Sequence, residues 1–174
     1  SKEIAAGVLE VETAGREIVV RVKEHGSFGS GSAALSDNFK PVLRIIQDTL
    51  RDIEGKIQVE GHTDDRPIAT AAFPSNWALS AARAVSVAHG LFGDDVLDEN
   101  RFTVAGHSDT QPLVSNTTAA GRARNRRVEV VVHQGLDAEA KRELEVLRAE
   151  DPEAFQQVRE ELIQRFELNP NEIF

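Results

Sequence analysis

The chain has 174 residues, of which 40% are hydrophobic, so it can build the core of one domain and is not disordered throughout. Its net charge of −9 disfavours binding to nucleic acid or to an anionic membrane through overall attraction. Cysteine is absent, which excludes disulfides, thiolate metal sites and cysteine nucleophiles.

The N-terminal half predicts a hairpin, a helix and a strand. Apolar and polar residues alternate over 8–12, Ala14-Gly15 turns the chain, and residues 18–22 are rich in β-branched side chains. Residues 26–32 contain three glycines and three serines, so we expect a flexible connection there. Apolar side chains then follow at helical spacing over 39–53, with Ser36 as a possible N-cap. Residues 56–60 predict a short strand, and 61–74 a loop.

The C-terminal half continues this alternation of strands and helices. A second helix is predicted from about Ser75 to residues 90–93, and strands are predicted over 102–105 and 127–133. The apolar stripe that we expect this helix to bury comprises Trp77, Ala81, Ala84, Val85, Ala88, Leu91 and Phe92. The order of elements predicts an α/β sandwich, with one mixed sheet and helices on one face.

The last segment, residues 134–174, predicts an acidic helical tail. Residues 136–174 hold five basic and eleven acidic side chains, a balance of −6 out of the total of −9. Asp151-Pro152 is a helix start signal, and Asn169-Pro170-Asn171 a stop signal. We expect the two apolar stripes of the tail to pack on the domain or on a second copy, and a mostly solvated appendage is the alternative. The stripes are Leu136, Ala140, Leu144 and Leu147, and then Phe155, Val158, Leu162 and Phe166.

Residues 59–68 are echoed by residues 104–113, with five of ten positions identical at an offset of 45. Each copy follows a predicted strand, so two similar loops should leave the same end of a parallel sheet, where such sheets place their sites. The shared glycines are explained by a common tight turn, but the two His-x-Asp triplets are not. We considered metal ligands in the set His62, Asp64, Asp65, His107 and Asp109. Because no pair has the i, i+4 spacing of a zinc signature, we expect no metal site.

Asp64 and Arg83 are predicted to face each other, because the polar start of the second helix lies beside the loop that carries Asp64. Such a pair is either a structural salt bridge or a receptor for a zwitterion, in which the carboxylate takes an ammonium and the guanidinium a carboxylate. A basic cluster surrounds Arg126 and Arg127, yet the acidic chain and the lack of exposed aromatic residues speak against nucleic acid. Strand alternation predicts that Arg126 borders the cleft and that Arg127 pairs with a neighbouring acid.

Three ordered motifs resemble those of the OmpA-like peptidoglycan-binding domain. They are Gly61-His62-Thr63-Asp64, Ser75-Asn76-Trp77-x-Leu79-Ser80-x-x-Arg83-Ala84 and Gly121-Arg122-x-x-Asn125-Arg126-Arg127-Val128-Glu129. The resemblance covers about residues 26–133. Residues 65–74 depart from the common form in a way that resembles flagellar motor stator subunits of the MotB and PomB type. We therefore divide the chain into an N-terminal hairpin with its Gly/Ser linker (1–35), an OmpA-like domain (26–133) and the tail (134–174).

The resemblance implies non-covalent binding to the peptide stem of the cell wall, chiefly to diaminopimelate. It places the ligand ammonium on Asp64 and the ligand carboxylate on Arg83. The peptidoglycan-binding residues that it implies are Thr63, Asp64, Asn76, Leu79, Arg83 and Arg126. No cofactor is implied, and without an activated nucleophile or an acid–base pair we expect a protein that is not an enzyme.

The resemblance also implies a place in the cell. It suggests the periplasmic domain of a single-pass inner-membrane protein that anchors the stator to the wall and is needed for motility. Because methionine is absent even at the start and no apolar run reaches about 20 residues, we expect a soluble fragment of that protein. The implied partners are the channel-forming stator subunit, ring proteins of the basal body and a second copy of the chain. The alternatives are another wall-anchoring outer-membrane protein or lipoprotein, and a metal-dependent wall hydrolase.

Overall fold

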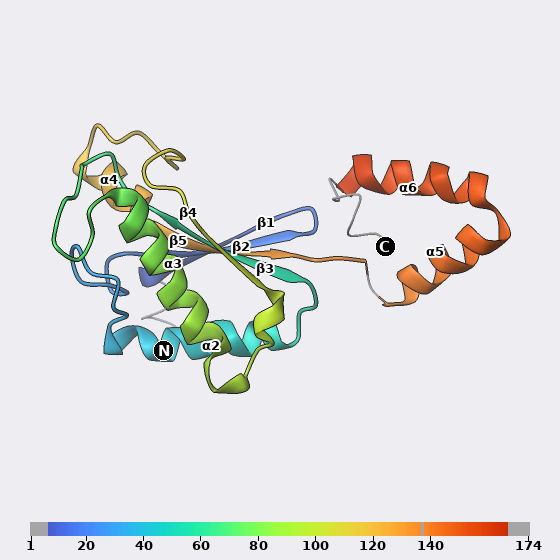
Figure 1. Cartoon of the computed structure of the whole chain (residues 1–174), viewed down its shortest axis with the longest axis horizontal. Helices are drawn as coiled ribbons and strands as arrows, with labels where there is room; N and C mark the ends of the chain where they lie inside the picture. Colours follow the sequence, from blue (N-terminus) through green and yellow to red (C-terminus); the bar gives the residue numbers. More distant parts are fainter. Residues whose placement is uncertain (1–6, 137, 167–174) are drawn as a thin grey trace.

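The computed structural model describes residues 7–136 and 138–166 and contains one five-stranded sheet in the order β1-β2-β5-β3-β4 (Figure 1). The strands are β1 (Leu9–Ala14), β2 (Glu17–Lys23), β3 (Lys56–His62), β4 (Phe102–Gly106) and β5 (Arg127–His133). The helices are α2 (Lys40–Arg51), α3 (Asn76–Phe92), α4 (Ala119–Asn125), α5 (Ala138–Glu150) and α6 (Pro152–Phe166). Short 3-10 turns lie at Asp37–Phe39, Gly93–Asp95 and Glu99–Arg101.

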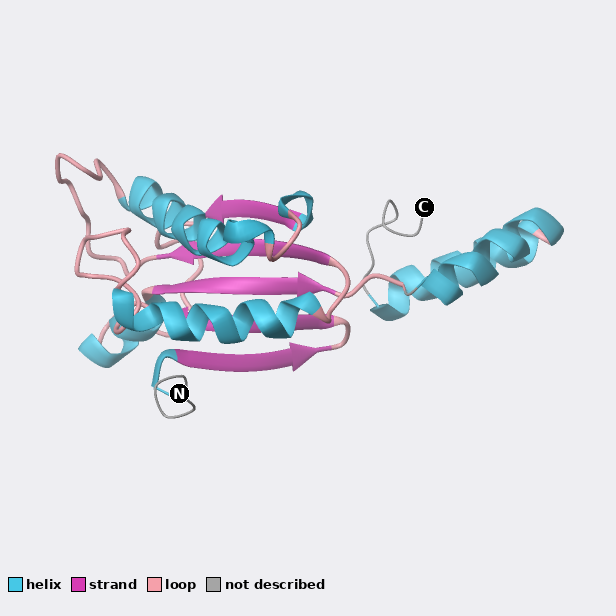
Figure 2. Cartoon of the chain, turned by 90° about the horizontal axis from the view of Figure 1, so that it is seen from below, coloured by secondary structure: helices cyan, strands magenta, loops and turns pink. Residues whose placement is uncertain are grey.

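The sheet is mixed, as the alternation of elements predicts. β1 and β2 form the expected hairpin, and Gly15 occupies the left-handed region at φ +58°, which glycine adopts without strain. β5 is antiparallel to both β2 and β3, while β3 and β4 run parallel. The helices α2 and α3 lie over the same face of the sheet, in front of the strands in Figure 2. The predicted α/β sandwich with helices on one face is therefore confirmed.

The core lies between this face and the two helices. In β5, Val128, Val130 and Val132 are at most 1% exposed, and they meet a stripe of α2 spaced at three and four residues. That stripe is Val42, Leu43, Ile46 and Leu50. The guanidinium of Arg101 closes the end of α2 by donating to the carbonyls of Leu50 and Ile53, and the Leu50 carbonyl also accepts from the Ile53 N–H at 3.4 Å.

The face that α3 buries differs from the predicted one by about a quarter of a turn. The helix starts beside Ser75 as predicted, and the Ser75 Oγ caps it by accepting from Ala78 N at 3.2 Å. However, Trp77 is 55% exposed and Val85 39% exposed, so the predicted stripe is wrong at both positions. The buried residues are Leu79, Ser80, Arg83, Ala84, Val87, Ala88 and Leu91. Ser80 and Arg83, at the polar start of the helix, thus lie inside the protein.

The N-terminal hairpin is an integral part of the sheet. β2 pairs with β5 along seven residues, and its Val22 is fully buried in the core. The expected flexible connection is wrong for Ser27 and Phe28, which are buried, and Ser27 Oγ donates to the carbonyl of Lys23. The segment is therefore held by the sheet and the core and does not depend on the stability of a lone hairpin.

The tail forms a helical hairpin, drawn in orange and red in Figure 1. Its apolar stripes pack on each other, through Leu144 of α5 and Phe155 of α6, in a cluster separate from the main core. Among the described residues each stripe covers the other and does not pack on the domain, so that part of the prediction is wrong, while packing on a second copy stays a prediction. Asp151 caps α6 as predicted, while the predicted stop at 169–171 and the Phe166 side chain lie outside the described residues. No helix in the described part of the chain is long and apolar enough to cross a membrane.

Candidate functional site

The two echoed loops leave β3 and β4 side by side, as predicted from the sequence. Gly61 pairs with Gly106 in the parallel register, and His107 N donates to the carbonyl of Gly61 at 2.9 Å. Neither glycine has the positive φ of a tight turn. A Cβ on Gly61 would collide with the backbone of Ser80, and one on Gly106 would lie 2.6 Å from Ala81 N. The glycines therefore allow α3 to approach the strands closely, which explains why Ser80 and Arg83 are buried and Trp77 is not.

Asp64 lies just beyond β3 and is held by two donors. Its Oδ2 accepts from Arg126 Nη1 at 2.7 Å, and its Oδ1 accepts from the backbone N–H of Arg66 at 3.0 Å. The Asp64 side chain is only 9% exposed, whereas that of Arg126 is 32% exposed. Asp64 therefore presents a mostly desolvated carboxylate, and Arg126 is the cation that solvent reaches beside it.

Glu24, directly after β2, links Arg126 to Arg83. Its two carboxylate oxygens pair with different guanidiniums, Oε1 with Arg126 Nε at 3.2 Å and Oε2 with Arg83 Nη1 at 2.5 Å. Arg83, whose side chain is 3% exposed, also donates to the carbonyls of Ser32 and Gly29 and lies over the Phe28 ring. Asp64 and Arg83 thus belong to one network but are joined through Arg126 and Glu24.

The remaining predicted residues surround this network in different ways. Thr63 is buried and donates from Oγ1 to the carbonyl of Asp64 at 2.9 Å. Asn76 Nδ2 donates to the carbonyl of Arg66 at 2.9 Å and so ties the start of α3 to the Asp64 loop. Leu79 is buried one turn further along the helix.

The adjacent arginines at the start of β5 have different surroundings, as strand alternation predicts. Arg126 joins Asp64 and Glu24, while Arg127 Nε pairs with Glu129 at 2.7 Å and is itself buried. Burial by itself would raise the pKa of the Glu129 carboxyl, but Arg127 and then Arg21 outweigh it and hold that pKa below its usual value. Arg126 and Arg127 both have acidic partners within the chain, so neither is a free cation for nucleic acid.

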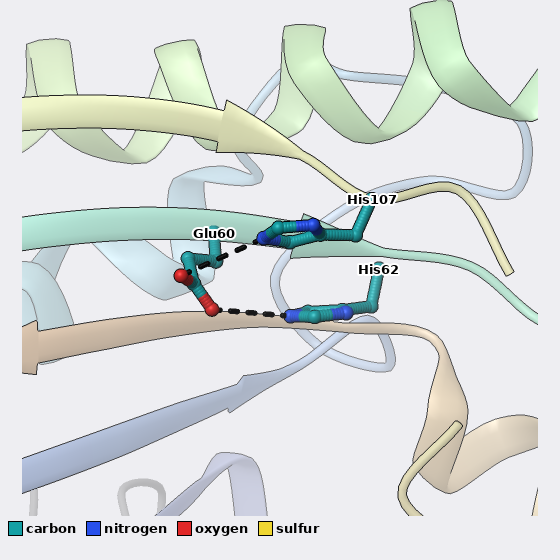
Figure 3. A group of neighbouring side chains, drawn as sticks. All are labelled: Glu60, His62 and His107. Carbon is teal, nitrogen blue, oxygen red and sulfur yellow. Dashed lines mark ion pairs between the residues drawn. The ribbon is translucent and has the colours of Figure 1, made fainter. Parts of the chain in front are cut away.

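A second polar cluster lies on the sheet face away from α2 and α3. The rings of His62 and His107 stack with centroids 5.0 Å apart, and the Glu60 carboxylate faces the edges of both (Figure 3). One nitrogen of each histidine and one carboxylate oxygen of Glu60 all lie within 4.8 Å of one another. Asp64 and Asp109 do not belong to it, because Asp64 binds Arg126 and Asp109 accepts from Ser108 Oγ. The cation-binding set that the structure offers is therefore different from the His-x-Asp set considered from the sequence.

Sequence reasoning missed Glu24 and Glu60. Glu24 is one residue beyond β2, where the antiparallel register with β5 brings it beside Arg126, and its N–H donates to the Arg126 carbonyl at 3.0 Å. Glu60 is two residues before His62 on β3, so both side chains point to one face. The spacing of two residues between Glu60 and His62 could have revealed Glu60 from the sequence. The place of Glu24 could be found only from the order of the strands in the sheet.

The comparisons agree on one family. The OmpA family model matches residues 27–126. Among curated relatives, Motility protein B of Bacillus subtilis is 35% identical over 125 residues, 71% of this chain and 48% of that protein. The Peptidoglycan-binding protein ArfA of Mycobacterium tuberculosis is 35% identical over 108 residues, 62% of this chain and 32% of that protein. The chain thus spans about half, or less, of the length of these curated relatives.

Solved structures give the same result. The cell wall anchor of the T6SS from Pseudomonas aeruginosa is 47% identical, with a TM-score of 0.71, and the match covers 76% of this chain and 92% of that one. A MotB-like protein from Desulfovibrio vulgaris is 34% identical, with a TM-score of 0.69 and coverages of 75% and 83%. The fold, the three ordered motifs and the family match over more than half of the residues lead to one conclusion: this chain belongs to the OmpA family.

Proposed function

We propose that this chain binds the peptide stem of peptidoglycan non-covalently and thereby anchors a larger envelope assembly to the cell wall. Asp64 takes the ammonium group of a diaminopimelate residue, and Arg83 together with Arg126 takes its carboxylate. Thr63, Asn76 and Leu79 shape the same site. The family match and the relatives named for peptidoglycan binding and wall anchoring support this proposal.

The observation that carries the proposal is the bridging position of Glu24. One carboxylate is held by Arg83 and Arg126 at once, so the two guanidiniums are already spaced to share a single carboxylate group. Asp64 lies on the other side of Arg126 and supplies the anionic pole. An amino acid with an ammonium and a carboxylate on one carbon has the same pair of charges. The ligand carboxylate would take the place of Glu24 on Arg126 first, because Arg126 is the more exposed of the two arginines.

The proposed site binds and does not catalyse. Its charged groups are engaged in ion pairs, and the relatives are named for motility, peptidoglycan binding and anchoring. We accordingly propose a binding module that is not an enzyme.

The assembly that this module serves has two candidates. The first is the flagellar motor stator, with the chain as periplasmic domain of a single-pass inner-membrane protein and the channel-forming subunit, basal-body ring proteins and a second copy as partners. The MotB relatives support it. The second is a T6SS, favoured by the 47% identity to the Pseudomonas aeruginosa wall anchor. Deleting the gene and measuring both swimming and T6SS-dependent secretion distinguishes them, since each candidate predicts loss of one process only.

The binding proposal is tested with purified cell-wall sacculi. The chain should sediment with walls whose stems carry diaminopimelate, and free diaminopimelate should compete it off. Walls with lysine at the same stem position lack the second carboxylate, so they should bind weakly. Equal sedimentation with both kinds of wall would refute the assignment of the ligand.

A further inference from the structure

The cluster of Glu60, His62 and His107 follows from the echo of the two loops. Because Gly61 and Gly106 are paired in the parallel ladder, the next residue of each strand is a histidine beside the other histidine. Glu60 precedes His62 by two residues and so points to the same face. The cluster is therefore fixed by the backbone register of β3 and β4, and not by long side chains that happen to meet.

Three of the four histidine nitrogens in this cluster have no hydrogen-bond partner. His62 is 2% exposed, and both of its ring nitrogens are buried without one. His107 Nε2 is also buried without a hydrogen-bond partner. Glu60 lies 3.7 Å from His62 Nε2 and 3.5 Å from His107 Nε2, which is too long for a strong hydrogen bond. Unpaired buried polar atoms are costly, so this geometry points to a further group between the three side chains.

We propose that Glu60, His62 and His107 bind one divalent transition metal ion, with Zn²⁺ as the best fit. Bonds of about 2.0–2.1 Å around a tetrahedral Zn²⁺ separate neighbouring donor atoms by about 3.3–3.4 Å. The two carboxylate–imidazole separations, 3.7 and 3.5 Å, need only small adjustments to reach that value. Two imidazoles and one carboxylate are a donor set that suits this ion, and solvent reaches the partly exposed His107 and Glu60 to supply a water as fourth ligand.

The surroundings favour a cation at this point. Glu60 supplies the negative charge of the cluster through its carboxylate. Gln58 donates to Glu60 Oε1 at 2.6 Å and orients the carboxylate. Gln111 Nε2 lies 3.2 Å from His107 Nδ1. If the amide oxygen and nitrogen of Gln111 exchange places, the oxygen can accept the proton on His107 Nδ1, which leaves His107 Nε2 to bind the metal.

Arg127 is the cation that opposes this binding, because it stands across from His62 in the β3–β5 ladder. Its charge is largely balanced, since its Nε pairs with Glu129 and its other nitrogens donate to the carbonyls of Asn125 and Gln111. A bound ion would join the ends of β3 and β4 and so stabilise the loops that follow them. The metal site is independent of the proposed wall binding, because it uses none of the residues assigned to the ligand.

The test uses the untagged chain, freed of metal by a chelator. Calorimetric titration with Zn²⁺ should show one ion per chain. Free Zn²⁺ at about 100 times Kd should raise the Tm by roughly 5–10 °C. His107→Gln and Glu60→Gln should each weaken binding more than about 100-fold, since even losing an outer-shell partner costs 10- to 100-fold. His133→Gln is the matched control, a histidine on β5 beside Glu17, and should bind as the parent does.

A spectroscopic readout covers the case in which a variant fails to fold. Co²⁺ added to the parent chain should give the intense visible absorption of a tetrahedral site, and Zn²⁺ should abolish it. The proposal is overturned if the parent binds no Zn²⁺, or if His107→Gln and His133→Gln bind it equally. Wall sedimentation of the metal-free chain is measured beside these titrations, so failure of one proposal is separable from failure of the other.

Discussion

Replacing Asp64 by Asn should abolish wall binding while leaving the fold intact. The Asp64 carboxylate is 9% exposed, so a ligand ammonium paired with it is largely desolvated. Removing one partner of such a pair costs about 2–5 kcal/mol, much of it from leaving the other charge unpaired. The expected loss of affinity is therefore roughly 30-fold to several thousand-fold.

The effect of the same change on folding should be much smaller. Asn retains an Oδ1 that accepts from the Arg66 N–H, so the turn after β3 is kept. The change removes the buried charge itself, and its partner Arg126 is one third exposed and still has Glu24, so no buried charge is left unpaired. Binding and stability should thus separate clearly in this variant.

The assay is sedimentation with diaminopimelate-containing walls, combined with urea unfolding. The matched control is Asp109→Asn, at the equivalent position of the second echo. Asp109 is exposed and accepts from Ser108 Oγ, away from Arg126, so this variant should bind like the parent. The reasoning is refuted if Asp64→Asn and Asp109→Asn bind equally well while both are folded.

Three further predictions follow from the same geometry. Glu24→Gln should raise wall affinity several-fold in sedimentation, because Glu24 competes with the ligand carboxylate for both arginines; weaker binding would contradict this role. Glu129→Gln should lower the unfolding free energy in urea by about 3–5 kcal/mol at pH 7, because it leaves Arg127 buried and unpaired. Because the pKa of Glu129 is lowered in the folded chain, the ionised carboxylate stabilises the fold at pH values above its unfolded pKa of about 4.3. This stabilisation is lost as the pH falls through the folded pKa, so the parent should lose more stability than Glu129→Gln between pH 5 and pH 3. A chain ending at Gly135 should keep its Tm and wall binding, because the tail helices pack mainly on each other; loss of binding would assign the tail a direct role.

The sequence predicted the sheet and the placement of the two loops because those features depend on local periodicity and on a repeated motif. Gly-His-x-Asp after each of two strands was enough to expect neighbouring loops at one end of a parallel pair, and the register confirms this. The helix spacing of α2 and the start of α3 near Ser75 were also local signals. The residues that the resemblance placed in the site remain a prediction for the binding experiment.

Other features depend on contacts between distant elements and could not be predicted. The buried face of α3 is set by the two glycines of the sheet beneath it, so helix periodicity alone placed Trp77 on the wrong side. Glu24 reaches Arg126 only because β2 pairs with β5. In the tail, each apolar stripe has the other as its partner, and neither stripe by itself indicates that.

Strand order gives the two copies of one motif different surroundings. β3 lies between β4 and β5, so its Asp64 stands beside Arg126 at the start of β5 and joins the charged network. β4 is an edge strand, so Asp109 of the second copy has no such neighbour and is exposed. The histidines of the two motifs are instead brought together, because they flank the one ladder that β3 and β4 share. The repeated sequence can therefore build one proposed wall-binding site and one proposed metal site without repeating either.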